Sequence, residues 1–483
     1  MSTPPPTPQP QPDPPPPAQP ATPPPSRRDL LMAMAGVSAT VVLAAFDSTI
    51  ISTTLPRVAE ALNGMALYAW VGTGYLLATA ASIMIFGRLG DMFGRKPLML
   101  VSVLIIALGS IACGLSQSMG QLILFRSLQG IGGGMMIATA FAAPADLFPD
   151  AKQRVRWMAL VSAAFAMASG IGPVLGGAAT QALGWRAAFF ISPIAAAVAL
   201  FLLARYFPRI KPVHTGERRI DWLGALLLVV AVGAPLAALE LGFASGDHAH
   251  PGLALGLAVA GAAAIALLVP IERRVASPIF PLRVLAGREP QLLNLAAMTV
   301  GAVMFVLIFY SPLLLQQVLG YTPSQAGLLL TPLVAAISVG SIINGRLFHR
   351  QTEPQRLMVF GACLLAAGTL MVLLISPGTS ALWILSAFFV NGCALGFLLP
   401  NLTLFMQMLS ERRDVGVASA LVQTTRAIGS ALGTALVGIL ISHSSVLNGV
   451  RTGLGLCIVL SLTCAVLAHR VKMKNLASAR KPS

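Results

Sequence analysis

The stretch Leu30–Pro56, LLMAMAGVSATVVLAAFDSTIISTTLP, decides the fold class of this chain. As an α-helix it is long enough to cross the hydrocarbon layer of a bilayer, which is about 30 Å thick. One carboxylate, Asp47, stands inside this apolar run, and Thr40 and Thr54 fall close to the same helical face. A charged side chain near the centre of a spanning helix costs roughly 2.5 to 3.5 kcal/mol on insertion scales, so it usually faces a protein interior and has a function. We therefore expect a membrane-spanning helix whose polar face points inward.

The whole chain has the composition of a membrane protein. Hydrophobic residues make up 56% of it and charged residues 10%, with a mean hydropathy of +0.80, whereas about a quarter of a soluble domain is charged. The apolar run from Leu30 is too long for the core of a cleaved signal peptide, so we expect it to stay in the membrane. The five cysteines lie in apolar segments without metal-ligand spacing, so we expect no disulfide, no metal site and no other cofactor.

Fourteen apolar spans predict an all-α polytopic membrane protein with fourteen transmembrane helices. Their approximate bounds are 30–56, 66–86, 97–116, 119–145, 155–180, 185–206, 221–243, 251–271, 290–316, 323–345, 357–376, 380–406, 414–442 and 450–469. With the N-terminus inside, 27 of the 32 Lys and Arg residues fall in cytoplasmic segments, three in outer loops and two, Arg126 and Arg426, inside spans. This positive-inside distribution predicts that both termini are cytoplasmic.

The same distribution of charge bears on partners. A net charge of +16 would suggest nucleic acid in a soluble protein. Here the positive charge is spread over short segments that face lipid headgroups, so we expect the bilayer and no nucleic acid as a partner. Arginine greatly outnumbers lysine and alanine is abundant, a composition typical of GC-rich bacterial genomes, which places the expected location in a bacterial inner membrane.

The chain repeats a loop motif. GRLGDMFGRK (87–96) lies between the second and third spans, and the degenerate copy GRLFHR (345–350) lies between the tenth and eleventh. Two halves of six spans with one inserted pair match the repeat pattern of secondary transporters. The predicted domains are a disordered Pro-rich cytoplasmic tail (1–28), an N-terminal six-helix bundle (29–208), an inserted helix pair (209–275), a C-terminal six-helix bundle (276–470) and a cytoplasmic tail (471–483).

Two further motifs complete the pattern. The fourth span carries Arg126, Gln129 and Gly130, and the fifth carries GIGPVLGG (170–177). With the loop motif, these stretches resemble the fourteen-span drug:proton antiporters of the major facilitator superfamily, over nearly everything from Ala45 to about Ala468. The resemblance implies the major facilitator fold, two six-helix bundles plus two inserted helices.

The resemblance also implies roles for motif residues. The loop signature implies that glycines form a tight turn between two helices while charged side chains beside them form a cytoplasmic gate; the residues are Gly87, Arg88, Gly90, Asp91, Gly94, Arg95 and Lys96. The signature in the fifth span is that of the export branches; its residues are Gly170, Gly172, Pro173, Gly176 and Gly177. Glycines four apart allow close helix contact, and a proline removes a backbone hydrogen bond and favours a bend.

Arg126 lies at a depth similar to that of Asp47, which predicts that the two pair. Such a pair would keep Asp47 ionised, and a movement that separates the two charges would make proton uptake easier. We therefore expect these residues to couple transport to protons. The alternative is a buried ion pair that only fixes packing.

Candidates for substrate binding are polar and aromatic residues of spans that cross both halves: Tyr75, Gln129, Phe305, Phe309, Asn391, Gln423 and Arg426. An aromatic residue in an apolar helix more often faces lipid or packs in the core. For Arg426, contact with substrate, with a carbonyl group or with water all stay open.

No nucleotide-binding signature is present, so an ion gradient must drive transport. We expect a proton-coupled exporter of drugs or other small amphipathic molecules, working by alternating access, and not an enzyme. A dedicated exporter of one metabolite and a proton-coupled importer of a vitamin or metabolite are the alternatives. The sequence does not decide whether a periplasmic adaptor binds the chain.

Overall fold

The structure is a computed structural model that describes residues 26–148, 151–209, 221–242, 251–275, 282–348, 351, 353–410 and 415–472. The described residues form helices and no strands. The long helices are α1 (Arg27–Ala61), α2 (Tyr68–Phe93), α3 (Arg95–Gly114), α4 (Met119–Ala140), α6 (Ala151–Leu183), α7 (Trp185–Tyr206), α8 (Trp222–Gly242), α9 (Pro251–Arg274), α10 (Arg288–Leu313), α11 (Pro323–Phe348), α12 (Gln355–Leu373), α13 (Ala381–Leu409), α14 (Val415–Ser442) and α15 (Val446–Arg470). A short helix, α5 (Ala143–Leu147), follows α4, and a π-helical turn (Leu314–Val318) follows α10.

These fourteen long helices match the fourteen predicted spans one for one, so the all-α fold class is confirmed. Within the described residues, twelve of them are long and apolar enough to cross a membrane; the other two are α6 and α8. Side chains exposed on the outer helices are apolar, as Leu108, Ile194 and Leu255 illustrate with 65%, 71% and 68% exposure. Such a surface suits lipid rather than water.

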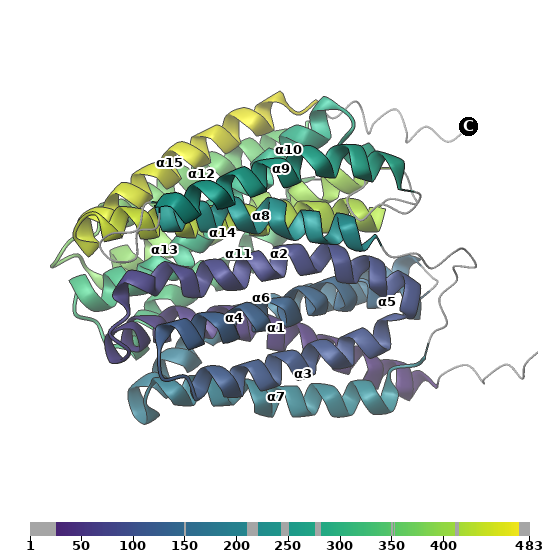
Figure 1. Cartoon of the computed structure of the whole chain (residues 1–483), viewed down its shortest axis with the longest axis horizontal. Coiled ribbons are helices and arrows are strands. Elements are labelled where there is room, and N and C mark those ends of the chain that lie inside the picture. The colour runs from purple at the N-terminus through teal and green to yellow at the C-terminus, as the bar shows by residue number, and fades with distance from the viewer. Residues whose placement is uncertain are drawn as a thin grey trace, which may run out of the picture.

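The helices gather in two sets (Figure 1). In the first, α1 packs against α6 and α7, α2 against α4, and α3 against α4 and α7. In the second, α10 packs against α14, α13 against α11 and α12, and α12 against α15. The sets meet where α6 lies along α11 and where α2 lies along α14. The main contacts between the two sets are therefore made by α2, α6, α11 and α14, and α1 also touches α10 and α11.

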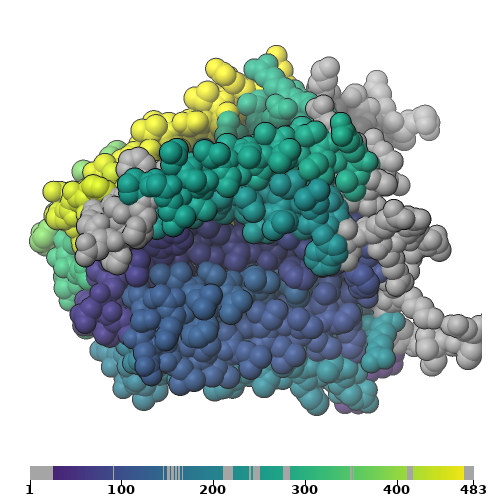
Figure 2. Space-filling model, viewed as in Figure 1, coloured from purple at the N-terminus to yellow at the C-terminus, as the bar shows by residue number. Residues whose placement is uncertain are grey.

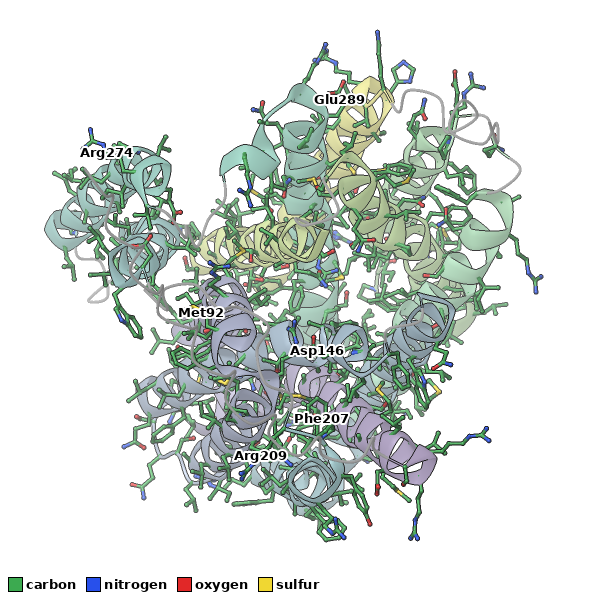
Figure 3. All side chains as sticks on the ribbon, turned by 90° about the vertical axis from the view of Figure 1, so that its right-hand side faces the viewer. Met92, Asp146, Phe207, Arg209, Arg274 and Glu289 are labelled. Carbon is green, nitrogen blue, oxygen red and sulfur yellow. The ribbon has the colours of Figure 1, made fainter. Side chains whose placement is uncertain are left out.

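Helices α8 and α9 form a pair of their own. They pack against each other, and α8 also touches α2 and α14, one helix from each set. Figure 2 shows the pair as a teal layer with the helices of the first set below it. Figure 3, a view from the right-hand side of Figure 1, shows that Met92, Asp146, Phe207, Arg274 and Glu289 share one end of the molecule. These residues stand near helix ends that the charge pattern assigns to the cytoplasm.

Candidate functional site

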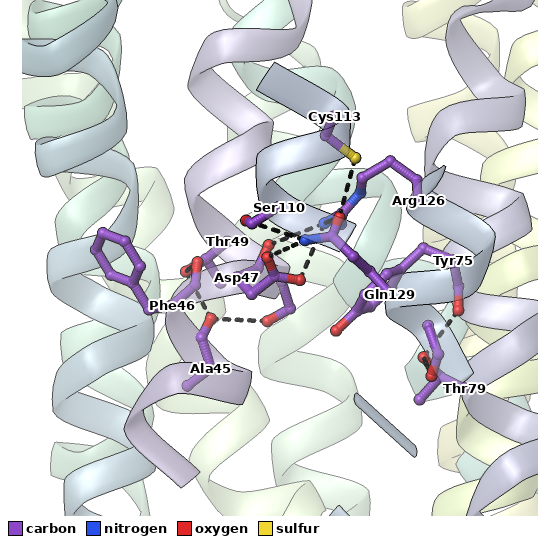
Figure 4. Close-up of polar contacts among 12 residues, drawn as sticks. Ala45, Phe46, Asp47, Thr49, Tyr75, Thr79, Ser110, Cys113, Arg126 and Gln129 are labelled. Carbon is purple, nitrogen blue, oxygen red and sulfur yellow. Dashed lines mark hydrogen bonds and ion pairs between the residues drawn. The ribbon is translucent and has the colours of Figure 1, made fainter. Parts of the chain in front are cut away.

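The centre of the first helix set holds the ion pair that the sequence predicted. Nη1 of Arg126 on α4 donates to Oδ2 of Asp47 on α1 at 3.0 Å, and each side chain is 1% exposed. Nε2 of Gln129, one turn after Arg126, donates to the other carboxylate oxygen, Oδ1, also at 3.0 Å (Figure 4). Both oxygens of Asp47 are thus hydrogen-bonded. A buried charge needs this kind of partner, because its desolvation costs several kcal/mol.

The amide of Gln129 joins a third helix to the pair. Its Oε1 accepts hydrogen bonds from Arg126 Nη1 at 3.0 Å and from the Cys113 thiol at 3.2 Å. Its Nε2 also donates to Ser110 Oγ at 3.1 Å. Ser110 and Cys113 lie on α3, and the sequence analysis did not select either of them. Their spacing of three residues, which places them on one helical face, was the available signal.

An aromatic ring covers the guanidinium. The centroid of the Tyr75 ring on α2 lies 4.2 Å from Cζ of Arg126, a cation–π distance. Gly130 allows this approach, because a Cβ there would lie 2.3 Å from the carbonyl oxygen of Tyr75. Among the described residues, Nε and Nη2 of Arg126 have no hydrogen-bond partner. The charge pair is therefore enclosed by α1, α2, α3 and α4, with spare donor capacity on the arginine.

The loop motif corrects one expectation. The tight turn lies at Gly94 alone and not across all the glycines of the motif, because α2 continues to Phe93 and α3 begins at Arg95. Gly94 has φ +87°, which favours glycine, whereas a Cβ at Gly87 or Gly90 would meet only ordinary contacts. Helix α2 therefore extends beyond the apolar span 66–86, and α3 begins before the apolar span 97–116. Polar residues at a membrane surface can continue a helix that began in the membrane.

Two basic residues of this motif connect helix ends. Nε of Arg95 forms an ion pair with Oδ2 of Asp146 on α5. Nζ of Lys96 donates to the carbonyl oxygens of Ala204, at 2.9 Å, and Phe207 at the end of α7. Asp146 was missed, because it follows the fourth predicted span and belongs to no motif.

For the rest of this motif, Nε of Arg88 is buried with no hydrogen-bond partner among the described residues. The side chain of Asp91 lies outside the described part of the structure.

The glycines of α6 lie at two helix contacts. A Cβ at Gly172 would lie 2.1 Å from Thr49 Oγ1, and one at Gly176 would lie 2.5 Å from the Ile50 carbonyl oxygen, both on α1. A Cβ at Gly177 would lie 2.3 Å from the carbonyl oxygen of Pro323 on α11. Conversely, a Cβ at Gly327 on α11 would lie 2.4 Å from the carbonyl oxygen of Pro173, which also accepts a 2.9 Å hydrogen bond from Thr53 Oγ1. Gly170, by contrast, has room for a side chain.

The substrate-binding candidates separate into three groups. Tyr75 and Gln129 belong to the buried ion-pair cluster described above. Phe305 and Phe309 stack on α10 with ring centroids 6.0 Å apart, Phe305 half-buried and Phe309 1% exposed. Gln423 and Arg426 are half-buried on α14.

Asn391 uses its side chain for contacts with neighbouring helix residues, and a role in substrate binding stays a prediction. It is fully buried, its Oδ1 accepts from Thr369 Oγ1 at 3.1 Å on α12, and its Nδ2 donates to the Ala387 carbonyl oxygen at 2.8 Å. The bond with Thr369 joins α13 to α12, and the bond to Ala387 lies within α13. Sequence alone does not distinguish such an interhelical contact from a ligand contact, because both place a polar side chain in an apolar helix.

Known proteins resemble this chain over most of its length. The family model described as Major Facilitator Superfamily matches residues 37–434. Multidrug resistance protein 3 of Bacillus subtilis strain 168 is 30% identical over 398 residues, which are 82% of this chain and 77% of that protein. The multidrug transporter protein MdtP of the same organism is 30% identical over 422 residues, 87% of this chain and 76% of that protein.

A solved structure agrees in fold. The crystal structure of an auto-inhibited POT family peptide transporter matches with a TM-score of 0.66 at 17% identity, covering 94% of this chain and 99% of that one. An identity this low speaks for the fold alone. The family match covers the ion pair, the loop motif and the α6 glycines, and the helices have the number and the apolar surface of a multi-pass membrane protein. The chain belongs to the major facilitator superfamily of membrane transporters.

Proposed function

We propose that this transporter exports amphipathic small molecules from the cytoplasm and that protons binding at Asp47 drive the export. The names of its relatives, which include multidrug resistance and multidrug transporter proteins, support the substrate range. The observation that carries the proton site is the full burial of Asp47 between Arg126 and Gln129. An intramembrane carboxylate with a partner on another helix is suited to exchange a proton when that partner moves.

The proposed cycle uses competition at this one carboxylate. When the site opens outward, Asp47 takes up a proton and releases both Arg126 and substrate. When it opens inward, the proton leaves as substrate enters from the cytoplasm or the inner leaflet. A proton gains about 2.3 kcal/mol from 100 mV and about 1.4 kcal/mol from one pH unit, so one proton supports roughly a hundredfold gradient of solute.

We propose that the two helix sets are the six-helix bundles that rock against each other, with α8 and α9 inserted between them in sequence. The seam formed by α6 with α11 and by α2 with α14 supports this division, because few elements cross it. We further propose that both termini face the cytoplasm of a bacterial cell, on the strength of the positive-inside pattern. A reporter fused after Arg470 would be active only in the compartment where the C-terminus lies.

The test is proton movement in proteoliposomes on addition of amphipathic dyes, with ethidium and the zwitterion rhodamine 110 among them. We compare wild type, Asp47→Asn and Glu60→Gln. Glu60 is the matched control, because it is an exposed carboxylate on the same helix at its outer end. Dye-driven proton movement should occur in wild type and Glu60→Gln and disappear in Asp47→Asn.

Other outcomes favour other readings. Equal proton flux in Asp47→Asn would move the proton site elsewhere. A response to one compound of a broad panel would favour the dedicated exporter, and uptake in the same direction as the protons would favour the importer. No response to any dye would refute export of amphipathic molecules.

A further inference from the structure

Arg426 is a cation in the middle of a membrane-spanning helix. It lies about 16 Å along α14 from the first residue, Val415, at the helical rise of 1.5 Å per residue. This depth exceeds the reach of an arginine side chain, so its guanidinium does not snorkel to the cytoplasmic headgroups. Within the described part of the chain, its guanidinium forms no hydrogen bond or ion pair. An unpaired charge at this depth needs compensation.

The second helix set contains no carboxylate that could compensate it. After residue 275 the chain has four acidic residues, Glu289, Glu353, Glu411 and Asp414. Glu289 is in the first turn of α10, Glu353 precedes α12, and Glu411 and Asp414 lie outside the described residues, 15 and 12 positions before Arg426. The buried carboxylate of the first set, Asp47, is already paired with Arg126. The spanning part of the second set therefore carries a net positive charge with no acidic side chain of its own.

Helix α14, which carries Arg426, is surrounded by other helices. From Val417 to Ile441, α14 has no fully exposed residue, because α2, α8, α10, α13 and α15 surround it. Arg426 is nevertheless half-buried, and none of its nitrogens belongs to the described side-chain atoms that are buried without a partner. The guanidinium nitrogens are therefore not sealed off by the packing of α14 against these helices.

Two neighbours complete a recognition surface. Gln423 lies one turn before Arg426 on the same helical face, and its Nε2, a hydrogen-bond donor, forms no hydrogen bond with the described residues. Gly301 on α10 touches the stem of Arg426, because a Cβ there would lie 2.9 Å from the Arg426 Cγ. Phe305 follows Gly301 by about one turn and presents a half-buried ring. A guanidinium, a free amide and an aromatic ring therefore lie along one side of the α10–α14 contact.

We propose that Arg426 and Gln423 bind an acidic group of the substrate, with its ring system against Phe305, so that the preferred substrates are amphipathic molecules bearing a carboxylate. A planar guanidinium binds a carboxylate through two parallel hydrogen bonds, and the amide supplies a third donor. That such substrates are also transported rests on the proposed export function. As a statement about binding it stands by itself.

The experiment uses two dyes that differ at one group. Rhodamine 110 carries a free carboxylate, and rhodamine 123 is its methyl ester. Fluorescence anisotropy of each dye with the purified full-length protein in a neutral detergent gives the two dissociation constants. Wild type should bind rhodamine 110 about tenfold or more tightly than rhodamine 123, the range expected for hydrogen bonds to a charged group. Arg426→Met should remove this preference, and Arg426→Lys should retain part of it, because it keeps the charge and loses the fork.

The outcomes are separable. Equal affinity of wild type for both dyes overturns the proposal, and so does a preference that persists in Arg426→Met. Thermal unfolding identifies a variant that fails to fold; Gln423→Leu, which removes no charge, then serves in its place and should reduce the preference. If the preference holds while no dye moves protons in proteoliposomes, the proposed export function fails and this binding site remains.

Discussion

Asp47 and Arg126 constrain each other, since each would be an isolated buried charge without the other. Removing one partner of a buried ion pair typically costs about 3 to 5 kcal/mol, whereas removing both can be nearly neutral. Gln129 binds both charged groups, at 3.0 Å in each case, so it adds to the coupling between them.

We expect Asp47→Asn and Arg126→Gln to lower the thermal stability of the protein in detergent, each by an amount that corresponds to about 3 kcal/mol. The double variant should recover much of this loss, because no uncompensated charge remains. Transport should not recover. Recovery of proton-coupled transport in the double variant would show that the pair only fixes packing.

The sequence located the charged residues of the site and two of their neighbours, Tyr75 and Gln129, but not the neighbours on α3. Asp47 and Arg126 stand out because any charge inside an apolar span is costly, and their equal depth predicted the contact. Ser110, Cys113 and Asp146 do not stand out, because small polar residues and residues at helix ends are common in such chains. The binding candidates were less certain for the same reason: Asn391 differs from a ligand contact only in what it touches.

At the scale of helices, α6 holds α1 on one side and α11 on the other by means of glycines from one motif. The contacts of Gly176 and Gly177 are with carbonyl oxygens, which do not move aside as a flexible side chain would. Overpacking of this kind typically costs about 1 to 3 kcal/mol.

Gly176→Ala should therefore destabilise the protein by about 1 to 3 kcal/mol, measured by thermal unfolding in detergent. Gly170→Ala is the matched control from the same motif, since its Cβ would lie 3.9 Å from the nearest atoms. It should leave the stability unchanged or raise it by up to about 1 kcal/mol, because alanine favours a helix over glycine. Equal effects of the two changes would contradict the packing described here.

The ion pair of Arg95 with Asp146 links α3 to α5 at the end of the molecule assigned to the cytoplasm. If it latches one conformation, Asp146→Asn should change the rate of transport while stability changes little, because partly exposed pairs contribute only about 1 kcal/mol or less. Side-by-side rates in proteoliposomes measure this. Exchanging the two charges, as Arg95→Asp with Asp146→Arg, should give a rate closer to wild type than either single change. If it does not, the ion pair does not stabilise one conformation of the transporter.

At the scale of the whole molecule, two buried or half-buried hydrogen bonds join the helix sets near the ends that the charge pattern assigns to the outside. The Tyr68 hydroxyl donates to the Phe309 carbonyl oxygen at 3.0 Å, and Gln316 Nε2 donates to the Thr53 carbonyl oxygen at 2.9 Å. A pocket of about 530 Å³ lies beside them at the outer surface, lined by residues of α1, α6, α7 and α11 that include Thr180. These bonds favour the conformation in which the outer ends stay together.

Tyr68→Phe combined with Gln316→Leu should shift the population toward an outward-open form roughly thirtyfold, because each bond contributes about 1 kcal/mol. A Thr180→Cys reporter, buried at 7% exposure in the parent, should then react faster with a membrane-impermeant thiol reagent added outside. Tyr321→Phe is the control, since that hydroxyl makes no cross-set hydrogen bond among the described residues. An unchanged reaction rate would mean that these bonds do not hold the outer side closed.

The overall fold was largely predictable, because bilayer thickness sets the length of every span and the positive-inside rule sets its direction. The helix ends were not. The α2–α3 connection is one glycine, where hydropathy had indicated a loop of ten residues, because hydropathy reports where the hydrocarbon ends and not where the helix does.

The contact between Lys96 and the end of α7 also bears on how the chain is made. Its acceptor at Phe207 is 111 residues further along the sequence. At the usual pace of synthesis, 5 to 20 residues per second, roughly 6 to 22 s pass between the two. During that interval the ammonium group of Lys96 has no carbonyl groups of α7 to bind, so the start of α3 lacks this contact until the sixth span has been made. The contact can form only once Phe207, at the end of the sixth span, has been synthesised.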